Sequence, residues 1–469
     1  MDNPLQSLLY QGKIPALEFL LKSGQYFPNM ISSFPTMSVV VDSTLLTGTY
    51  SNKHKVPALV WYDTDNKRFI SYGSAKKEVL KIGIKSILKE SVYNLNHLHL
   101  SGKVQTIHED VEEQTSSINT LVYRGENDKR LQLPCLLKFF NVLKGNETVQ
   151  GPASLSYGIL SKINPRNKYT HFWQGFGFND RFATEEIIYL LKQNRLPAFS
   201  LVYFSDNDKI VHKKGENETK GIEKADKQLQ NILNCFSSWE KAIEDIVWIV
   251  MGDSGQTDIG DNKKRSLIDL RAILRDFNIY KLGKPIQEKD QLVLGLNERM
   301  SFIYILDTTV DLKEIVNILA KDSRIDHIAW KQQDEVSVVS YLHHGEFSFK
   351  PIGEYVDSYG QTWTINGNPK LLDLQIDENK QIQYNDYPDG LMRLYSAFYS
   401  HKGNYIIVNA KPGFEFIGEG SPTHVGGASH GSLHKQDTYF PMIVVGTDEK
   451  PRHMRMVDFK EYICRILNS

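Results

Sequence analysis

Four short apolar segments, each closed by a turn signal, constrain the fold of this chain most strongly. They are Ala198–Phe204, Ile246–Met251, Tyr405–Asn409 and Phe440–Gly446. Short apolar runs of this kind are typical of strands buried on both faces of a parallel sheet. Because amphipathic helical patterns such as Lys220–Cys235 lie between them, the sequence predicts an α/β domain built in layers.

Two of these segments lead directly into acidic turns. Asp208 follows the first segment, with His212 four residues further on, and Asp253 follows the second in a glycine-containing turn. Ligands of layered α/β sheets bind beyond the carboxyl ends of the strands, so both turns are candidate metal sites. One carboxylate with one imidazole suits Zn²⁺ or Mn²⁺. The alternatives are a solvated polar loop around His212 and a capped turn at Asp253.

The segment Phe34–Gly48 (FPTMSVVVDSTLLTG) places a hydroxyl at a helix start. Pro35 ends an extended stretch, and the apolar residues that follow predict a helix that begins at or near Ser38. The free N–H groups of a helix N-terminus favour an anion and lower the cost of ionising a hydroxyl. Ser38 is therefore a candidate nucleophile or phosphate ligand, and a plain N-cap serine is the alternative.

A loop rich in glycine and histidine precedes the last apolar strand. Ser421–His434 (SPTHVGGASHGSLH) carries His424, His430 and His434, and Asp437 follows. Metal ligation, phosphate binding by protonated histidine and an ordinary surface loop all remain open for it.

The middle of the chain has a different pattern. Asn297–Ile305 predicts a strand and Leu312–Leu319 a helix, and Asp326–Trp330 and Val336–Tyr341 predict two further strands. This order predicts a small α+β lobe, residues 265–414, inserted into a core made of residues 1–264 and 415–469. Residues 350–385, rich in Gly, Asn and Asp, are expected to form loops over that lobe.

Charge and composition narrow the possible partners. Lys and Arg (55) nearly balance Asp and Glu (56) in the 469 residues, so neither a nucleic-acid polymer nor an anionic membrane is an expected partner. No apolar run approaches the ~20 residues of a membrane span. The three cysteines are widely spaced and the first residues do not resemble a signal peptide, which predicts a cytoplasmic location.

These motifs, in this order, resemble the alkaline phosphatase superfamily, and most closely its type I phosphodiesterase/nucleotide pyrophosphatase branch. Ser38 matches the nucleophile of the branch's Pro-Thr-x-Thr/Ser motif, and Asp208 and His212 match its Asp-x-x-x-His pair. Asp253 matches the Asp of an Asp-His-Gly motif, and His430 matches a late histidine. The resemblance implies an alkaline-phosphatase-like three-layer sandwich with a mostly parallel sheet, and two zinc ions. Asp208, His212 and His430 would bind the first ion, and Asp253 the second, with Mn²⁺ as a possible substitute.

The sequence departs from the branch at three positions. Ser254 stands where the second ion's imidazole ligand is expected, and Val41 where a phosphate-binding Asn often occurs. The branch also opens with a strand that ends in a metal-binding Asp; this chain is expected to lack that strand, and Asp2 falls near the spacing. The second ion's site is therefore expected to be incomplete, with His424 or His434 as candidate replacements.

The expected activity is metal-dependent hydrolysis of small phosphoesters through a covalent Ser38 intermediate, with residues 265–414 covering the cleft. His171 and Trp173 are candidates for the substrate mouth, because aromatic rings stack on nucleobases. Two alternatives stay open. One is a degenerate member that binds a phosphorylated ligand with little or no turnover, and the other is a phosphotransferase such as a mutase.

Overall fold

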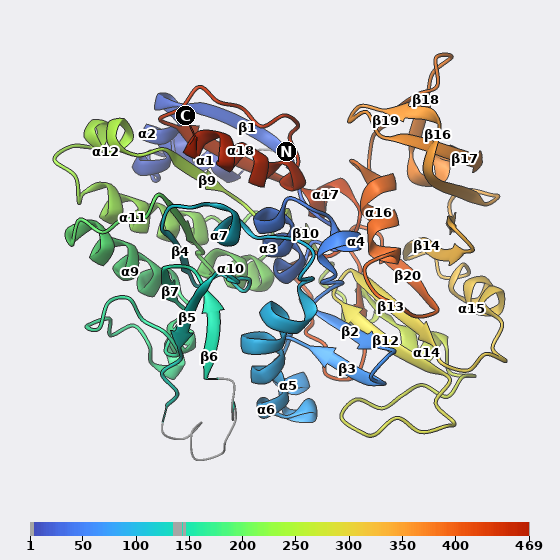
Figure 1. Ribbon diagram of the computed structural model, residues 1–469. Helices are drawn as coiled ribbons and strands as arrows, with labels where there is room; N and C mark the ends of the chain where they lie inside the picture. The colour runs from blue at the N-terminus through green and yellow to red at the C-terminus, as the bar shows by residue number, and fades with distance from the viewer. Residues whose placement is uncertain (1–3, 135–142, 144–146, 469) are drawn as a thin grey trace.

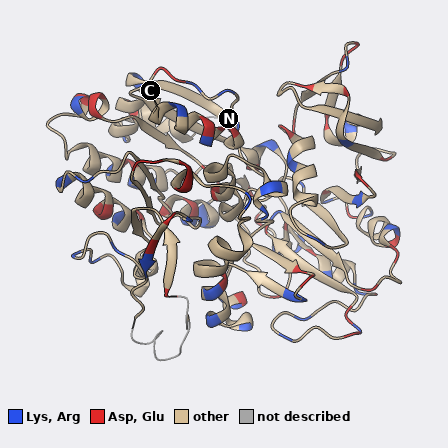
Figure 2. Ribbon diagram, viewed as in Figure 1, with Lys and Arg blue, Asp and Glu red and all other residues tan. Residues whose placement is uncertain are grey.

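The computed structural model describes residues 4–134, 143 and 147–468, so Asp2 lies outside the described residues. Figure 1 shows a helix-rich half that contains both termini, and a second half dominated by one large sheet. Lys/Arg and Asp/Glu are interspersed along both halves, in line with the near-zero net charge (Figure 2). Within the described residues, no helix has both the length and the apolar character needed to cross a membrane.

The helix-rich half contains two three-stranded sheets rather than one parallel sheet. In the first, β23 (Tyr439–Val445) lies between β1 (Gln25–Ile31) and β9 (Trp248–Met251), and both pairings are antiparallel. In the second, β4 (Thr115–Ile118) lies between β7 (Ser154–Ser156) and β8 (Phe199–Val202), and both pairings are parallel. The predicted strands after residues 198 and 246 are confirmed, but the parallel arrangement holds only for β8.

β8 and β9 carry Asp208 and Asp253 just beyond their carboxyl ends, and each strand pairs on one edge only among the described residues. Their apolar residues are all half-exposed, unlike those of a strand enclosed on both sides. Helices α2 (Pro15–Ser23), α9 (Asp180–Lys192) and α11 (Lys220–Leu233) pack together in this half.

The large sheet has nine strands and is almost entirely antiparallel. Its order is β12-β13-β20-β14-β15-β16-β19-β18, with β17 paired to β16, and only β16 and β19 run parallel. The strands are β12 (Leu292–Asn297), β13 (Met300–Ile305), β14 (Ile325–Gln332), β15 (Glu335–Val339), β16 (Phe347–Asp357), β17 (Thr362–Gly367), β18 (Leu374–Ile376), β19 (Gln381–Tyr384) and β20 (Tyr405–Ala410).

Three predictions for this half were wrong in detail. The strand expected over Asn297–Ile305 is confirmed over Met300–Ile305 (β13), but Glu298 and Arg299 form the turn of a hairpin that joins it to β12. The predicted loops over 350–385 contain strands β16–β19. Tyr405–Ala410 was expected in a parallel sheet but pairs antiparallel with β13 and β14. An apolar run predicts a buried strand, but it does not predict which strands lie beside it. The helix α15 (Leu312–Leu319) is confirmed.

The two ends of the segment 265–414 meet. β11 (Leu267–Asp269) pairs in parallel with β21 (Glu415–Ile417), so the chain leaves and re-enters the helix-rich half at one place. The segment shares a hydrophobic core with the rest of the chain. One buried cluster joins its residues Phe302 and Leu391 to Val40 and Phe440, which lie outside it. The helix α3 (Ser38–Thr47) lies in this shared core.

The remaining elements connect these layers. They are α1 (Pro4–Tyr10), α4 (Ser51–His54), β2 (Val60–Asp63), β3 (Arg68–Ser71), α5 (Lys76–Ile82), α6 (Ile84–Leu88), η1 (Lys89–His99), α7 (Ile107–Asp110), β5 (Asn127–Arg130), β6 (Thr148–Gly151), η2 (Phe172–Gly177), α10 (Asp206–Lys214), α12 (Trp239–Asp245), β10 (Thr257–Asp258), α13 (Lys263–Ser266), α14 (Leu270–Ile273), η3 (Pro369–Leu372), α16 (Gly390–Phe398), β22 (Ala428–Ser429), α17 (Lys435–Thr438), η4 (Met456–Asp458) and α18 (Phe459–Leu467).

Candidate metal centre and nucleophile

Helix α3 presents one accessible hydroxyl. Its first residue is Ser38, as predicted, and Ser38 is half-exposed whereas every other residue of the helix is buried. The Ser38 Oγ donates to Oδ2 of Asp253 at 3.3 Å. A hydroxyl at this end of a helix sits in the positive field of the peptide dipoles, which stabilises an alkoxide or a bound phosphoryl group.

Three predicted ligands converge beside this hydroxyl. Asp208 and His212 lie one turn apart on α10, and His212 Nε2 is 3.2 Å from Asp208 Oδ1. His430, which follows β22, brings its Nε2 to 3.8 Å from the same oxygen. One ligand atom from each of the three residues lies within 4.8 Å of the others, so the set could hold one cation.

Both imidazoles are oriented for ligation. His212 donates Nδ1–H to the carbonyl of Ala428 at 2.8 Å, and His430 donates Nδ1–H to the carbonyl of Thr36 at 2.6 Å. Metal-bound histidines are held in this way, because the hydrogen bond at one nitrogen leaves the lone pair of the other free. The donor set of two imidazole nitrogens and one carboxylate therefore fits Zn²⁺ or Mn²⁺.

Buried carboxylates gather at this point beside three histidines, and against the effect of burial the charges of His212, His430 and His424 lower the pKa of Asp208 to about 2. Burial raises the pKa of Asp253, and the charge of Asp208 raises it further. Burial also raises the pKa of Asp42, on α3, to about 7, although the backbone N–H of Leu121 opposes the shift. A bound cation would relieve this repulsion, which is why a group of buried acids fits a metal better than an empty pocket.

Comparison with known proteins gives the site its context. The sequence profile described as type I phosphodiesterase/nucleotide pyrophosphatase matches residues 5–344. The chain belongs to this family. The matched range contains Ser38, Asp208, His212 and Asp253, whereas His430 lies beyond it. No curated protein matches the chain significantly in sequence.

Several solved structures share the fold. Human ectonucleotide pyrophosphatase/phosphodiesterase 5 superposes with a TM-score of 0.57 at 14% identity, over 97% of this chain and 90% of that one. An inactive variant of the murine protein in complex with AMP gives 0.56 at 13% identity, over 98% and 91%. Phosphonoacetate hydrolase from Sinorhizobium meliloti 1021, in complex with phosphonoformate, gives 0.55 at 14% identity, over 98% and 92%. The family is typically metal-dependent, and it is named for the hydrolysis of phosphodiesters and pyrophosphates.

The departures from the family pattern have clear positions in the structure. Val41 is buried in the shared core and cannot donate to a phosphate. His434 lies apart from the ligands, where its Nδ1 accepts from the backbone N–H of Gln436 at the start of α17. His424 does lie at the site, but beside His212, with ring centroids 4.2 Å apart, and not beside Asp253. Neither histidine therefore replaces the missing ligand next to Ser254.

Sequence analysis missed three residues of the site. Glu298, from the β12–β13 turn, shares the histidine cluster, and its carboxylate together with that of Asp208 raises the pKa of His212 to about 10, against the effect of burial. Tyr203, just after β8, lies close enough to Ser38 and Asp253 for both to influence its phenol, whose pKa is raised chiefly by burial. Gln256 donates to Asp208 Oδ1 at 2.6 Å. No sequence pattern marked Glu298 or Gln256 as a site residue, and Tyr203 was marked only by its place at the end of a predicted strand.

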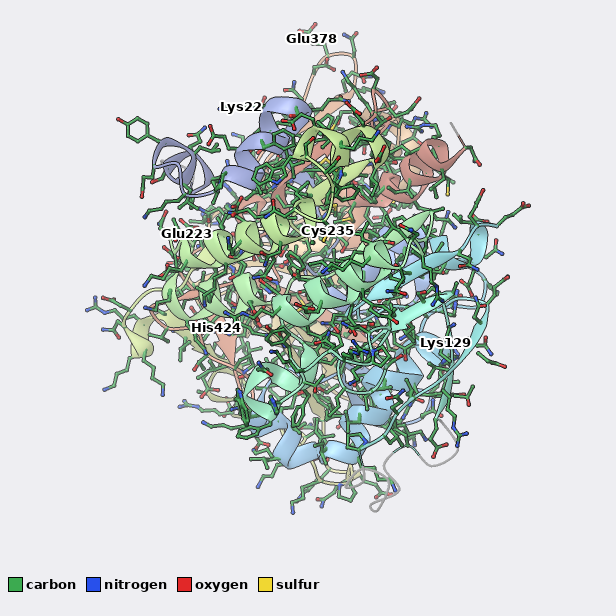
Figure 3. All side chains as sticks on the ribbon, turned by 90° about the vertical axis from the view of Figure 1, so that its left-hand side faces the viewer. Lys22, Lys129, Glu223, Cys235, Glu378 and His424 are labelled. Carbon is green, nitrogen blue, oxygen red and sulfur yellow. The ribbon has the colours of Figure 1, made fainter. Side chains whose placement is uncertain are left out.

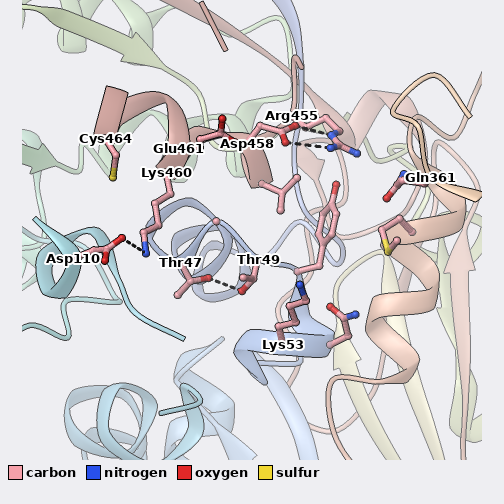
Figure 4. A pocket seen from close by; sticks show the side chains of 15 residues that line it. Thr47, Thr49, Lys53, Asp110, Gln361, Arg455, Asp458, Lys460, Glu461 and Cys464 are labelled. Carbon is pink, nitrogen blue, oxygen red and sulfur yellow. Dashed lines mark hydrogen bonds and ion pairs between the residues drawn. The ribbon is translucent and has the colours of Figure 1, made fainter. Parts of the chain in front are cut away.

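A cavity of about 570 Å³ lies at the other end of α3 (Figure 4). Thr47, Lys53, Arg455 and Lys460 are among the residues that line it. Since α3 rises ~1.5 Å per residue and runs from Ser38 to Thr47, this cavity is more than ~10 Å from Ser38. It does not belong to the candidate centre.

Asp42 should make the metal-free protein less stable as the pH rises. Its folded-state pKa of about 7 exceeds the usual aspartate pKa of 3.8, so between these values the folded chain holds a proton that the unfolded chain has lost. The free energy of unfolding then falls as the pH rises through this window, by up to ~1.4 kcal/mol for each pH unit. Urea unfolding of wild type and Asp42→Asn should show that their stability difference changes in this direction from pH 4 to 7.

The control for this experiment is Asp65→Asn, which alters an exposed carboxylate. A stability difference between wild type and Asp42→Asn that stays constant over the window would contradict the predicted shift.

Proposed function

We propose that the chain is a metal-dependent hydrolase of small phosphoesters, of the phosphodiesterase/nucleotide pyrophosphatase type, with Ser38 as the nucleophile. The observation that carries this proposal is the position of the Ser38 hydroxyl, at an accessible helix N-terminus and 3.3 Å from Asp253, beside the cluster of Asp208, His212 and His430. Membership of the family supports the same reaction class.

Each of these residues has a distinct role in the proposed reaction. Ser38 Oγ attacks phosphorus in line, so that an O–P bond forms while the P–O bond to the leaving group breaks. Asp253 Oδ2 accepts the hydroxyl proton, for which its raised pKa suits it. Water then displaces the serine from phosphorus and regenerates the hydroxyl. Asp208, His212 and His430 would hold a cation that neutralises the charge developing on the phosphoryl oxygens and activates water.

The surroundings of the centre suggest where substrate binds. The loop 171–178 exposes three aromatic side chains, Phe172, Trp173 and Phe176, which are 70%, 68% and 54% exposed. Lys209, on the same helix as Asp208, donates to the carbonyl of Phe178 at 2.6 Å and so ties this loop to α10. We assign the aromatic loop to the substrate mouth and the segment 265–414 to a cap. The proposed partner is a small phosphoester, and the proposed location, on the basis of the sparse cysteines, is the cytoplasm.

The degenerate alternative is less favoured, because the nucleophile and three ligands stand together despite Ser254 in place of an imidazole. A ligand-binding protein without turnover would have no need for an accessible hydroxyl on this helix end.

Removal of bound metal should abolish the activity. After dialysis against a chelator, hydrolysis of a chromogenic phosphodiester should fall at least ~10²-fold, since the cation supplies several kcal/mol of charge stabilisation. Zn²⁺ or Mn²⁺ should restore it, whereas Ca²⁺ should not, because Ca²⁺ prefers oxygen ligands to imidazole. The assay should include monoesters to define the substrate class. Full activity in metal-free buffer would refute the proposed function.

A further inference from the structure

The two-residue turn between β12 and β13 places a carboxylate among the histidines. Glu298 adopts a left-handed conformation with φ 58°, which is uncommon outside glycine and costs conformational energy. Its side chain is 10% exposed, and Oε2 accepts from Ser429 Oγ at 2.7 Å. The large sheet therefore contributes a buried acid to a cluster that is otherwise built by the helix-rich half.

Glu298 thereby forms a second group of potential metal ligands with two histidines. The ligand atoms of His212, Glu298 and His424 lie within 4.8 Å of one another. The rings of His212 and His424 are stacked with an angle of 27° between their planes, and His424 Nδ1 is 4.0 Å from Glu298 Oε2. Figure 3 labels His424, which lies in that view below the helix α11 that carries Glu223.

A buried acid holds His424 in place. Glu415, on β21, is 0% exposed; its Oε2 accepts from His424 Nδ1 at 2.9 Å, and its Oε1 accepts from the backbone N–H of the same residue at 2.6 Å. A carboxylate behind an imidazole fixes the tautomer with Nε2 unprotonated and makes that nitrogen a better metal ligand. Glu415 therefore prepares His424 for ligation.

We propose that His212, Glu298 and His424 form a second cation site beside Asp208 and His430. Two imidazoles and one carboxylate suit Zn²⁺, Co²⁺ or Mn²⁺. Because Nδ1 of His212 donates to Ala428, this residue offers only Nε2 and can ligate one ion at a time. With His212 in the second site, the first ion would be held by Asp208 and His430, whose Oδ1 and Nε2 lie 3.8 Å apart. This inference rests on the proposed function in one respect, which is that a first ion is bound at Asp208 and His430.

The site would also couple the two halves of the molecule. His212 comes from α10, His424 from the loop 421–434 and Glu298 from the hairpin of the large sheet. An ion bound to all three would fix the segment 265–414 against the helix that carries Asp208.

The test counts bound ions rather than turnover. Apoprotein is titrated with Co²⁺, followed by the cobalt d–d absorption and by metal analysis after desalting. Wild type should hold two ions per chain, and Glu298→Gln and His424→Ala should each hold one. Glu298→Gln keeps the shape of the side chain and an oxygen for Ser429, and circular dichroism of the apoprotein checks its fold.

Matched controls are available in the same sheet and among the exposed histidines. Glu335→Gln alters an acid that likewise accepts from a serine, Ser348 Oγ at 2.9 Å, and His343→Gln alters an exposed imidazole. Both should hold two ions. Glu415→Gln should weaken the second ion's affinity ~10–100-fold without affecting the first, as expected of a residue that acts through its imidazole partner.

The inference would be overturned if Glu298→Gln and His424→Ala both bound as many ions as wild type, with the same affinity. It would also be overturned if wild type bound only one ion and Glu298→Gln still bound that ion. Since binding is measured without substrate, failure here is distinct from failure of the proposed hydrolysis. A chain that binds both ions yet cleaves no phosphoester would refute only the latter.

Discussion

Replacement of Ser38 by alanine should lower the hydrolysis of a chromogenic phosphodiester at least ~10³-fold, which corresponds to ~4 kcal/mol of lost transition-state stabilisation. The loss should fall on kcat, because no other hydroxyl of α3 is accessible at the centre: the rest of the helix is buried. Substrate binding and the number of bound metal ions should change little, since the proposed cation ligands Asp208, His212 and His430 are untouched. Steady-state kinetics together with metal analysis measure both quantities.

Ser43 provides the matched control on the same helix. Its hydroxyl is buried and donates to the carbonyl of Val39 at 2.6 Å, so Ser43→Ala removes a hydroxyl from α3 without reaching the centre. It should retain near-normal turnover. If Ser38→Ala and Ser43→Ala were equally active, Ser38 would not be the nucleophile. Mass spectrometry of wild type quenched during turnover should find the phosphoryl or nucleotidyl group on Ser38.

Replacement of Arg299 by methionine should lower the free energy of unfolding by ~3–5 kcal/mol. Arg299 Nε donates to Asp437 Oδ2 at 2.9 Å, and both side chains are 0% exposed. The guanidinium also donates to three backbone carbonyls, those of Ala410, Lys411 and Phe414. Methionine fills a similar volume but leaves the Asp437 carboxylate buried without its cation. Urea unfolding at pH 7 measures the loss.

The same change should disturb the centre, because Asp437 accepts from the backbone N–H of Ser432 and so anchors the loop that carries His424 and His430. Affinity for Co²⁺ should therefore fall together with stability. Arg465→Gln is the control: Arg465 is 37% exposed and pairs with Glu461 one helical turn away, so its loss should change stability by less than ~0.5 kcal/mol. A loss below ~1 kcal/mol for Arg299→Met would contradict the assigned role of the buried pair.

The part of the centre that sequence reasoning found depends on local regularities. Asp208 and His212 are four residues apart, a spacing that puts both on one face of α10. Ser38 follows an extended proline segment and precedes an apolar helix, so its place at a helix start could be predicted. His430 was predicted as a ligand from its glycine-rich context and from the family resemblance. These signals lie within a few residues of each ligand.

The strand assignments succeeded and failed for the same reason. Apolar runs revealed β8, β9, β20 and β23 as strands, of which β20 and β23 are largely buried and β8 and β9 only partly. They did not reveal strand partners, and so β20 and β23 proved antiparallel. The Gly- and Asn-containing stretch over 350–385 forms strands because its apolar residues Trp363, Leu374 and Ile382 pack into the shared core.

The sequence alone identified the family, the candidate nucleophile and the first group of candidate cation ligands, because those residues occur in short motifs whose spacing encodes their geometry. Only the tertiary structure could place Glu298 and His424 against His212, or pair Arg299 with Asp437. Glu298 is 86 positions from His212 and 126 from His424, and Arg299 is 138 positions from Asp437. Their meeting depends on how nine strands pair and where the segment 265–414 returns through β11 and β21. Such long-range contacts arise from packing that no local pattern specifies.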